Sequence, residues 1–153
     1  MSEMALAHLA IAVEELDQAT PIYAALGFEL GDVEQVVREK VRLRKCVKDG
    51  LCIELLEAYP KGEGSVAKFI AKRGACLHHV AISSKNVRSD LRRLGKSGIK
   101  ALAGYPAEGS EGTTVAFLDP KTTGGVLIEL VERLVLTQRR KGAEEQKTGK
   151  SRK

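Results

Sequence analysis

Apolar and polar positions follow a pattern that runs through this chain twice. The first half reads as a strand, a helix and three strands, at residues 5–13, 14–26, 28–34, 36–47 and 51–58. The second half reads in the same order, at residues 77–83, 86–97, 99–103, 113–118 and 126–132. The pattern predicts two βαβββ modules, at about 5–58 and 77–133, with a bridging helix at about 65–73.

A single βαβββ module cannot cover its own sheet face, so two copies are expected to pack side by side. We predict one α+β domain over residues 1–137, in which the paired modules form an open curved sheet around a cleft. Pro21 complicates the first helix. Either that helix begins late, with Asp17 or Thr20 as its cap, or its first half is irregular. Ser65 is expected to cap the bridging helix.

The net charge of +5 belongs to the end of the chain. Residues 138–153 hold seven Lys or Arg and two Glu, which leaves 18 basic and 18 acidic residues in the rest of the chain. This segment has no apolar face, so we expect a disordered basic tail and no dedicated nucleic-acid partner. Its electrostatics would allow only weak contact with RNA or membranes.

The remaining composition indicates a soluble enzyme-sized domain. The start of the chain lacks a signal-peptide pattern and the apolar runs are too short for a membrane span, so a cytoplasmic protein without membrane partners is expected. Cys46, Cys52 and Cys76 are odd in number and show no CxxC spacing. They are interpreted as reduced thiols.

Two histidines and two glutamates recur with the repeat. His8 opens HLAIAV and His79, 71 residues later, opens HVAISS. Glu54 lies in LCIELLE and Glu129, 75 residues later, lies in VLIELVE. Strand alternation places small residues beside each histidine, which leaves space in front of the imidazole. A carboxylate within an apolar strand needs a cation or several donors, because burying it unpaired is costly.

The joint pattern predicts that His8, Glu54, His79 and Glu129 converge on one divalent metal ion. Two nitrogen and two oxygen ligands without thiolate suit Zn, Co, Mn, Ni or Fe(II), and do not choose among them. His78 is expected to point to the opposite face of its strand, in a packing or supporting role.

Four segments resemble those of a known family: residues 8–13, 65–74 with SVAKF and KRG, 77–81 with LHH, and 115–132 with PKTTGGVLIEL. They are similar to the vicinal oxygen chelate superfamily, which includes glyoxalase I, extradiol dioxygenases and the fosfomycin and bleomycin resistance proteins. Within it, the chain looks most like the methylmalonyl-CoA epimerase family. The resemblance covers about residues 5–133, and the SVAKF, LHH and PKTTGGVLIEL segments are its most specific part.

This resemblance implies a homodimer of paired modules with a metal in the cleft, bound by His8, His79 and Glu129, while the position of Glu54 holds Glu or Gln in relatives. The implied reaction interconverts (R)- and (S)-methylmalonyl-CoA. A base removes the C2 proton, the resulting enolate is stabilised by the metal, and the proton returns on the opposite face. Glu129 is implied to be both ligand and catalytic acid/base, and the substrate an acyl-CoA.

The chain departs from the family pattern at several places. Where one type of relative has a second catalytic Glu, this chain has Leu43, and Glu39 is the nearby alternative base. The loops at 109–112 and 119–121 also differ. Lys121 is expected either to meet a phosphate or carboxylate of the substrate or to be a solvated turn residue.

Two other functions use the same fold. One is a glyoxalase I-like lactoylglutathione lyase with the same four ligands. The other is a non-catalytic small-molecule binding protein, which would not need the intact His and Glu quartet.

Overall fold

The computed structural model describes residues 4–132, so the predicted tail at 138–153 and the end of the predicted domain lie outside the described residues. The first module contains β1 (Leu6–Ala12), α1 (Leu16–Ala25), β2 (Glu29–Val36), β3 (Val41–Lys48) and β4 (Leu51–Ala58). Helix α2 (Gly64–Arg73) follows. The second module contains β5 (Leu77–Ser84), α3 (Val87–Gly95), β6 (Ala107–Glu108), β7 (Thr114–Leu118) and β8 (Ile128–Glu132). Two short 3-10 turns, η1 (Ser110–Gly112) and η2 (Pro120–Thr122), flank β7.

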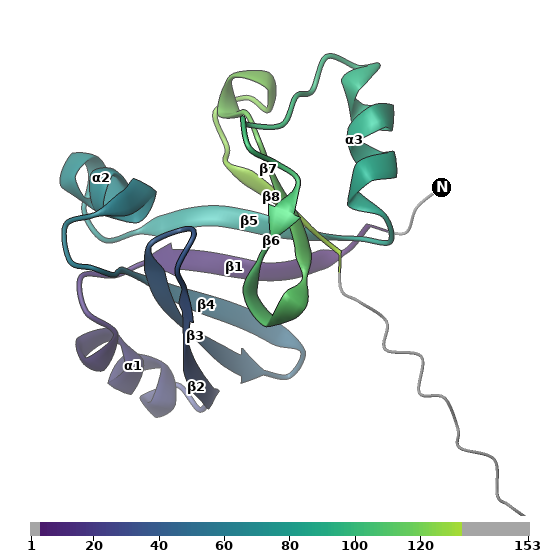
Figure 1. Cartoon of the computed structure of the whole chain (residues 1–153). Helices are drawn as coiled ribbons and strands as arrows, with labels where there is room; N and C mark the ends of the chain where they lie inside the picture. Colours follow the sequence, from purple (N-terminus) through teal and green to yellow (C-terminus); the bar gives the residue numbers. More distant parts are fainter. Residues whose placement is uncertain (1–3, 133–153) are drawn as a thin grey trace, which may run out of the picture.

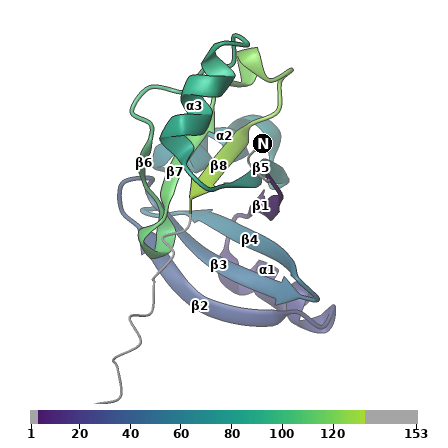
Figure 2. The same cartoon turned by 90° about the vertical axis from the view of Figure 1, so that its right-hand side faces the viewer.

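The two modules share one eight-stranded curved sheet, in the order β2-β3-β4-β1-β5-β8-β7-β6 (Figures 1 and 2). The strand order of the second module is that of the first in reverse, because β1 pairs in parallel with β4 and β5 pairs in parallel with β8. The modules join where β1 runs antiparallel to β5. The predicted α+β class, with paired modules in an open curved sheet, is therefore confirmed.

Helices α1 and α2 cover opposite faces of the first half of the sheet. The α1 side buries Leu16, Cys46 and Leu55, while α2 packs Val66 against a cluster that includes Leu43. Helix α3 packs Val87 against β7 and β8 in the second half, in the place that α1 has in the first. In the described part of the chain, no helix has the length and apolar character to cross a membrane.

The last strand of each module caps the first helix of that module. Glu57 in β4 accepts a hydrogen bond from the backbone N–H of Leu16, at 2.7 Å. Glu132 in β8 accepts the equivalent bond from Val87, at 2.8 Å. The first N–H groups of a helix lack partners within it and favour a nearby negative charge. The repeat thus carries its own helix caps.

This capping explains why the expectation for the first helix was wrong. Helix α1 begins at Leu16, and neither Asp17 nor Thr20 caps it. The carboxylate of Glu57 comes from a distant strand, which local sequence patterns do not show. Pro21 lies inside the helix and removes one backbone donor, while Glu57 supplies a partner at the start of the helix. Ser65 does not cap α2 either, since that helix begins one residue earlier.

The second module differs from the prediction in its first hairpin strand. Residues 99–103 form only an isolated bridge from Ala101 to Leu118. The strand that pairs with β7 at the sheet edge is β6, which lies between the segments predicted to be strands at 99–103 and 113–118. Gly98 and Gly104 both have positive φ and bend the chain on either side of the predicted strand. In the first module, β2 continues to residue 36 and β3 begins at residue 41, so the predicted break at residue 35 lies too early.

Candidate metal centre

The sheet register brings the four predicted ligands onto neighbouring strands. His8 and His79 lie on the central strands β1 and β5, while Glu54 and Glu129 lie on β4 and β8. Ala10 pairs with Glu54 on one side and His79 on the other. Ala81 pairs in the same way with His8 and Glu129. Both alanines are fully buried, and their small side chains leave space between the larger ones.

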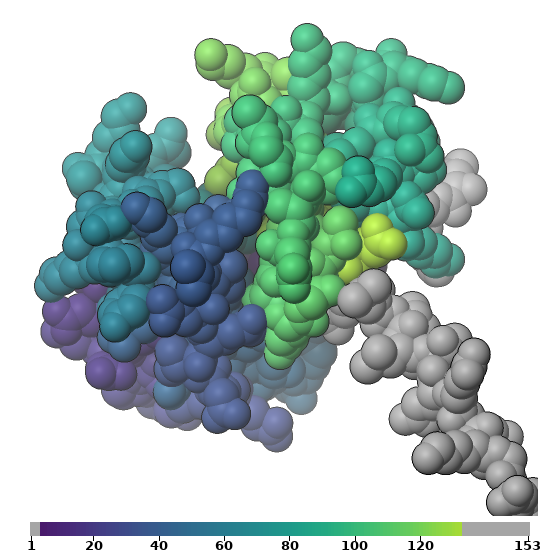
Figure 3. Space-filling view, viewed as in Figure 1, coloured from purple at the N-terminus to yellow at the C-terminus, as the bar shows by residue number. Residues whose placement is uncertain are grey.

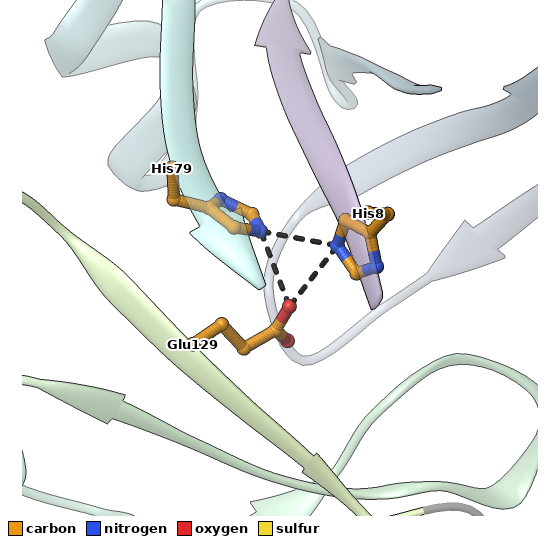
Figure 4. A group of neighbouring side chains, drawn as sticks. All are labelled: His8, His79 and Glu129. Atoms are coloured by element: carbon orange, nitrogen blue, oxygen red, sulfur yellow. Dashed lines mark hydrogen bonds and ion pairs between the residues drawn. The ribbon is translucent and has the colours of Figure 1, made fainter. Parts of the chain in front are cut away.

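Three of these side chains point at one place (Figure 4). Nε2 of His8 lies 3.4 Å from Nε2 of His79, and Oε2 of Glu129 lies 3.2 Å from each of these nitrogens. All three residues are buried. Cation–ligand bonds of about 2.0–2.2 Å place adjacent donor atoms about 3.0–3.5 Å apart. The triangle therefore fits one divalent ion bound by two nitrogens and one oxygen.

Glu54 lies beside this triangle and not within it. Its Oε2 is 3.8 Å from Nε2 of His8, and it does not belong to the group of donors that lie close to one another. Glu54 is as deeply buried as Glu129. Its role as a fourth ligand stays a prediction.

The two carboxylates have different electrostatic environments. Burial alone would raise the pKa of Glu129, but hydrogen bonds from His79 and His8 and their charges lower this pKa to about 2. Burial raises the pKa of Glu54, and the opposing charges of His8, His79 and Lys45 do not reverse that shift. Burial lowers the pKa of His8, but Glu129 and Glu54 overcome this effect and raise it. Glu129 is therefore ionised at neutral pH.

His78 does not point to the opposite face of the strand as predicted. In β5, His79 pairs with Ala10 and Leu77 pairs with Ile11, so His78 forms a bulge that interrupts strand alternation. Its Nδ1 lies 2.8 Å from Nδ1 of His79, and its ring packs edge-on against Phe69 of α2.

The contact between the imidazoles of His78 and His79 limits which of their ring nitrogens can carry a proton. Burial, followed by the neighbouring His79, lowers the pKa of His78 to about 4, so its ring is neutral at neutral pH. A hydrogen bond between the two Nδ1 atoms requires one to donate and one to accept. If His79 donates from Nδ1, its Nε2 would offer a lone pair to a metal ion in place of the hydrogen bond to Glu129. In this arrangement His78 supports the centre by accepting the hydrogen bond from Nδ1 of His79.

The centre lies in a cavity of about 790 Å³. Its lining includes all four predicted ligands and His78. Apolar walls come from both modules, among them Leu43, Val115 and Phe117. The ring of Phe117 packs edge-on against His79, with ring centroids 5.0 Å apart. The cavity is large enough for one end of a larger ligand, and the burial of the donor residues limits their contact with water.

Two of the residues noted as departures also line this cavity. Leu43 is buried in its wall, where the family pattern would place a second base. Glu39 lies at the cavity, where its Oε1 accepts hydrogen bonds from Tyr105, at 2.9 Å, and Arg38, at 2.6 Å. Lys121 lies in η2, apart from the described residues that line the cavity.

Sequence reasoning missed two groups that shape the site. Glu111 of η1 lines the cavity and forms an ion pair with Lys45, whose Nζ is 2.6 Å away. Both residues come from segments that the sequence pattern identifies only as loop and strand. Their partnership spans 66 residues and joins the two modules, so only the fold could show it.

Comparisons with known proteins agree with this geometry. Residues 7–117 match the model of the glyoxalase/bleomycin resistance protein/dioxygenase superfamily. The chain belongs to this superfamily. The ethylmalonyl-CoA/methylmalonyl-CoA epimerase of Cereibacter sphaeroides is 36% identical over 80% of this chain and 93% of its own.

Solved structures show the same relationship. The methylmalonyl-CoA epimerase of Mycobacterium tuberculosis has a TM-score of 0.78 and 31% identity, over 83% of this chain and 86% of its own. A variant of the Streptomyces coelicolor methylmalonyl-CoA epimerase, in complex with 2-nitronate-propionyl-CoA, also has a TM-score of 0.78 and 31% identity. That match covers 86% of this chain and 95% of the Streptomyces chain.

Proposed function

We propose that this protein is a metal-dependent epimerase that interconverts (R)- and (S)-methylmalonyl-CoA. The observation that carries the proposal is the group of His8, His79 and Glu129, whose donor atoms converge within 3.4 Å of one another in a buried cavity. The relatives named as methylmalonyl-CoA epimerases, at up to 36% identity, support the choice of substrate.

The reaction requires that a weakly acidic C–H bond be broken and remade. The proton at C2 leaves to a carboxylate, and the bonding electrons move onto the thioester oxygen. A divalent ion held by the two imidazoles and Glu129 would act as a Lewis acid for that negative charge. The nitrogen and oxygen donors of this site suit such an ion.

Glu129 is the residue we propose to move the proton on one face of C2. Its carboxylate is ionised at neutral pH, because the two histidines lower its pKa. It is therefore ready to accept a proton, but as a weak base it depends on stabilisation of the charge that develops on the substrate. Glu129 is itself buried on β8, and its contacts with both imidazoles, at 3.2 Å, hold its side chain in place.

The opposite face of C2 needs a second group. Leu43 has no proton to give, and its position in the wall contributes only apolar surface. Glu39 lines the same cavity, held by Tyr105 and Arg38, and is our candidate for this role. The homodimer and the cytoplasmic location stay predictions.

Exchange of the C2 proton tests the proposal directly. We expect the Co²⁺- or Mn²⁺-loaded full chain to exchange the C2 proton of methylmalonyl-CoA for deuterium from D₂O, followed by NMR. His79→Ala removes one donor and should abolish exchange, whereas Lys85→Ala, at an exposed residue just after β5, should not. Absence of exchange with the metal-loaded protein would refute the epimerase proposal. A parallel assay with a glutathione hemithioacetal identifies the lyase alternative.

A further inference from the structure

Lys45 places a positive charge inside the cavity, close to the metal centre. It lies on β3 beside Glu54 of β4, with which it forms a register pair. Its side chain faces the cavity in line with Leu43 and Val47, and is only 24% exposed.

The partner of this lysine is Glu111, which belongs to the opposite module. Nζ of Lys45 lies 2.6 Å from Oε2 of Glu111, and the backbone N–H of Glu111 donates to Glu34, at 2.9 Å. These contacts join η1 to β2 and β3 across one side of the cavity. Figure 3 shows the corresponding blue and green segments in contact on the front of the molecule.

The Lys45–Glu111 ion pair is suited to exchange of one partner for another anion. The side chain of Glu111 is 67% exposed, and ion pairs that reach solvent contribute little to stability. Glu111 also has a φ of 51°, a conformation that a residue with a side chain seldom adopts. Breaking the ion pair between Lys45 and Glu111 should therefore cost little stability.

The charges that line the cavity favour such an exchange. A divalent ion would balance Glu54 and Glu129, and Glu111 balances Lys45. Glu39 is already paired with Arg38. A substrate whose acyl group carries a carboxylate adds one negative charge, which loses part of its hydration on entering the cavity and is stabilised there by a cationic partner. Lys45 provides that partner once Glu111 is displaced.

We propose that Lys45 binds the carboxylate of the acyl group in exchange for Glu111, and so selects carboxylated acyl-CoA substrates over uncharged ones. This inference rests on the proposed function, since it concerns the acyl end of the same cavity. Lys45 acts as a specificity-determining residue, and Glu111 is the internal competitor that occupies its ammonium group when no substrate is bound.

Equilibrium binding of two ligands that the proposed reaction leaves chemically unchanged tests the inference. Malonyl-CoA carries the carboxylate and acetyl-CoA does not, and both are titrated into the metal-loaded full chain by calorimetry. We expect Lys45→Met to weaken malonyl-CoA binding by about tenfold or more, because a hydrogen bond between charged groups is lost. Acetyl-CoA binding should stay within about twofold, since Lys45 contributes no comparable contact to it.

Two further variants give the inference its sharpest test. Lys45→Arg keeps the charge and should retain most of the preference for malonyl-CoA. Glu111→Gln removes the competitor and should strengthen malonyl-CoA binding, which is the opposite of what loss of a substrate contact would do. Equal weakening of both ligands in Lys45→Met, or weaker malonyl-CoA binding in Glu111→Gln, overturns the inference. Circular dichroism and metal content confirm that each variant is folded.

The outcomes separate this inference from the proposed reaction. If malonyl-CoA is preferred through Lys45 but the C2 proton of methylmalonyl-CoA does not exchange, the binding inference stands and the epimerase proposal fails. If exchange occurs and Lys45→Met leaves the preference unchanged, the inference alone is wrong.

Discussion

Removal of the metal should lower the stability of the whole domain, because the ligands belong to both modules. His8 and His79 lie on β1 and β5, the two strands that join the modules, and Glu129 lies on β8. An ion held by these three residues binds only the folded chain, because residues this far apart in the sequence are not held together in the unfolded chain. Metal binding therefore adds directly to the free energy of unfolding.

The expected magnitude follows from mass action. At a free metal concentration about 100 times the dissociation constant, the free energy of unfolding should rise by about 2.7 kcal/mol. A domain of this length should then gain about 8–12 °C in melting temperature, on the usual scale of a few degrees per kcal/mol. The donor spacing of 3.2–3.4 Å allows this gain without movement of the sheet.

The assay compares chelator-treated and Co²⁺-loaded protein by thermal unfolding and by chemical denaturation. His79→Ala should abolish the shift at the same metal concentration, while Lys85→Ala should keep it. Glu54→Gln should retain most of the shift, since Glu54 lies beside the group of three close donors. An equal shift in wild type and His79→Ala would contradict the site, and so would no shift with any divalent ion.

Three other outcomes are expected. His78→Leu should weaken metal affinity by about 10–100-fold in a chelator competition, while His78→Asn, which keeps an acceptor near the same place, should lose less; equal losses would contradict the orientation argument. Glu132→Ala should lower the free energy of unfolding in urea by about 1 kcal/mol, because it removes the bond to Val87 and leaves α3 with the cap that Asn86 provides. Glu57→Ala should cost more because Glu57 also pairs with Arg42; no change in either variant would contradict these bonds. Burial, with the nearby Glu39, raises the pKa of Tyr105 to about 12, so its contribution to stability is complete below a pH of about 10 and is lost as pH rises toward 12. Burial also raises the pKa of Tyr23. Ultraviolet titration should therefore show a component near pH 12 that is missing in Tyr105→Phe, and a component near pH 12 that persists in this variant would refute the assignment.

The fold and the site could be predicted where the two modules repeat each other. They could not be predicted where the repeat is interrupted. His8 and His79 recur with Glu54 and Glu129 because each module supplies the same strands, so the repeat alone is enough to place the four residues on adjacent strands. His78 could not be placed, because a bulge breaks the alternation on which strand predictions depend.

Contacts between residues far apart in the sequence could not be predicted either. The ion pair of Lys45 with Glu111 depends on how the loop before β7 lies against β3, and no periodicity encodes that. The prediction for the start of α1 failed for the same reason, since its cap comes from Glu57, which follows Leu16 by 41 residues in the sequence.

A signal for these caps was nevertheless present in the sequence. LCIELLE and VLIELVE each contain two glutamates three residues apart, and residues three apart on a strand face opposite sides of the sheet. If the first glutamate of each pair faces the cleft, the second must face the helix of its module. Glu57 and Glu132 confirm this geometry with bonds to Leu16 and Val87.

The same symmetry makes the difference between the cleft glutamates informative. Glu54 and Glu129 occupy equivalent positions, yet Glu129 contacts both imidazoles at 3.2 Å, while Glu54 approaches only His8, at 3.8 Å. The pKa of Glu129 falls as a result, and burial raises that of Glu54. Two identical modules would give two equal carboxylates, but a reaction that moves a proton to and from one carbon needs groups with different roles. The position of both imidazoles nearer to Glu129 supplies that difference, and it favours our proposal that Glu129 moves the proton.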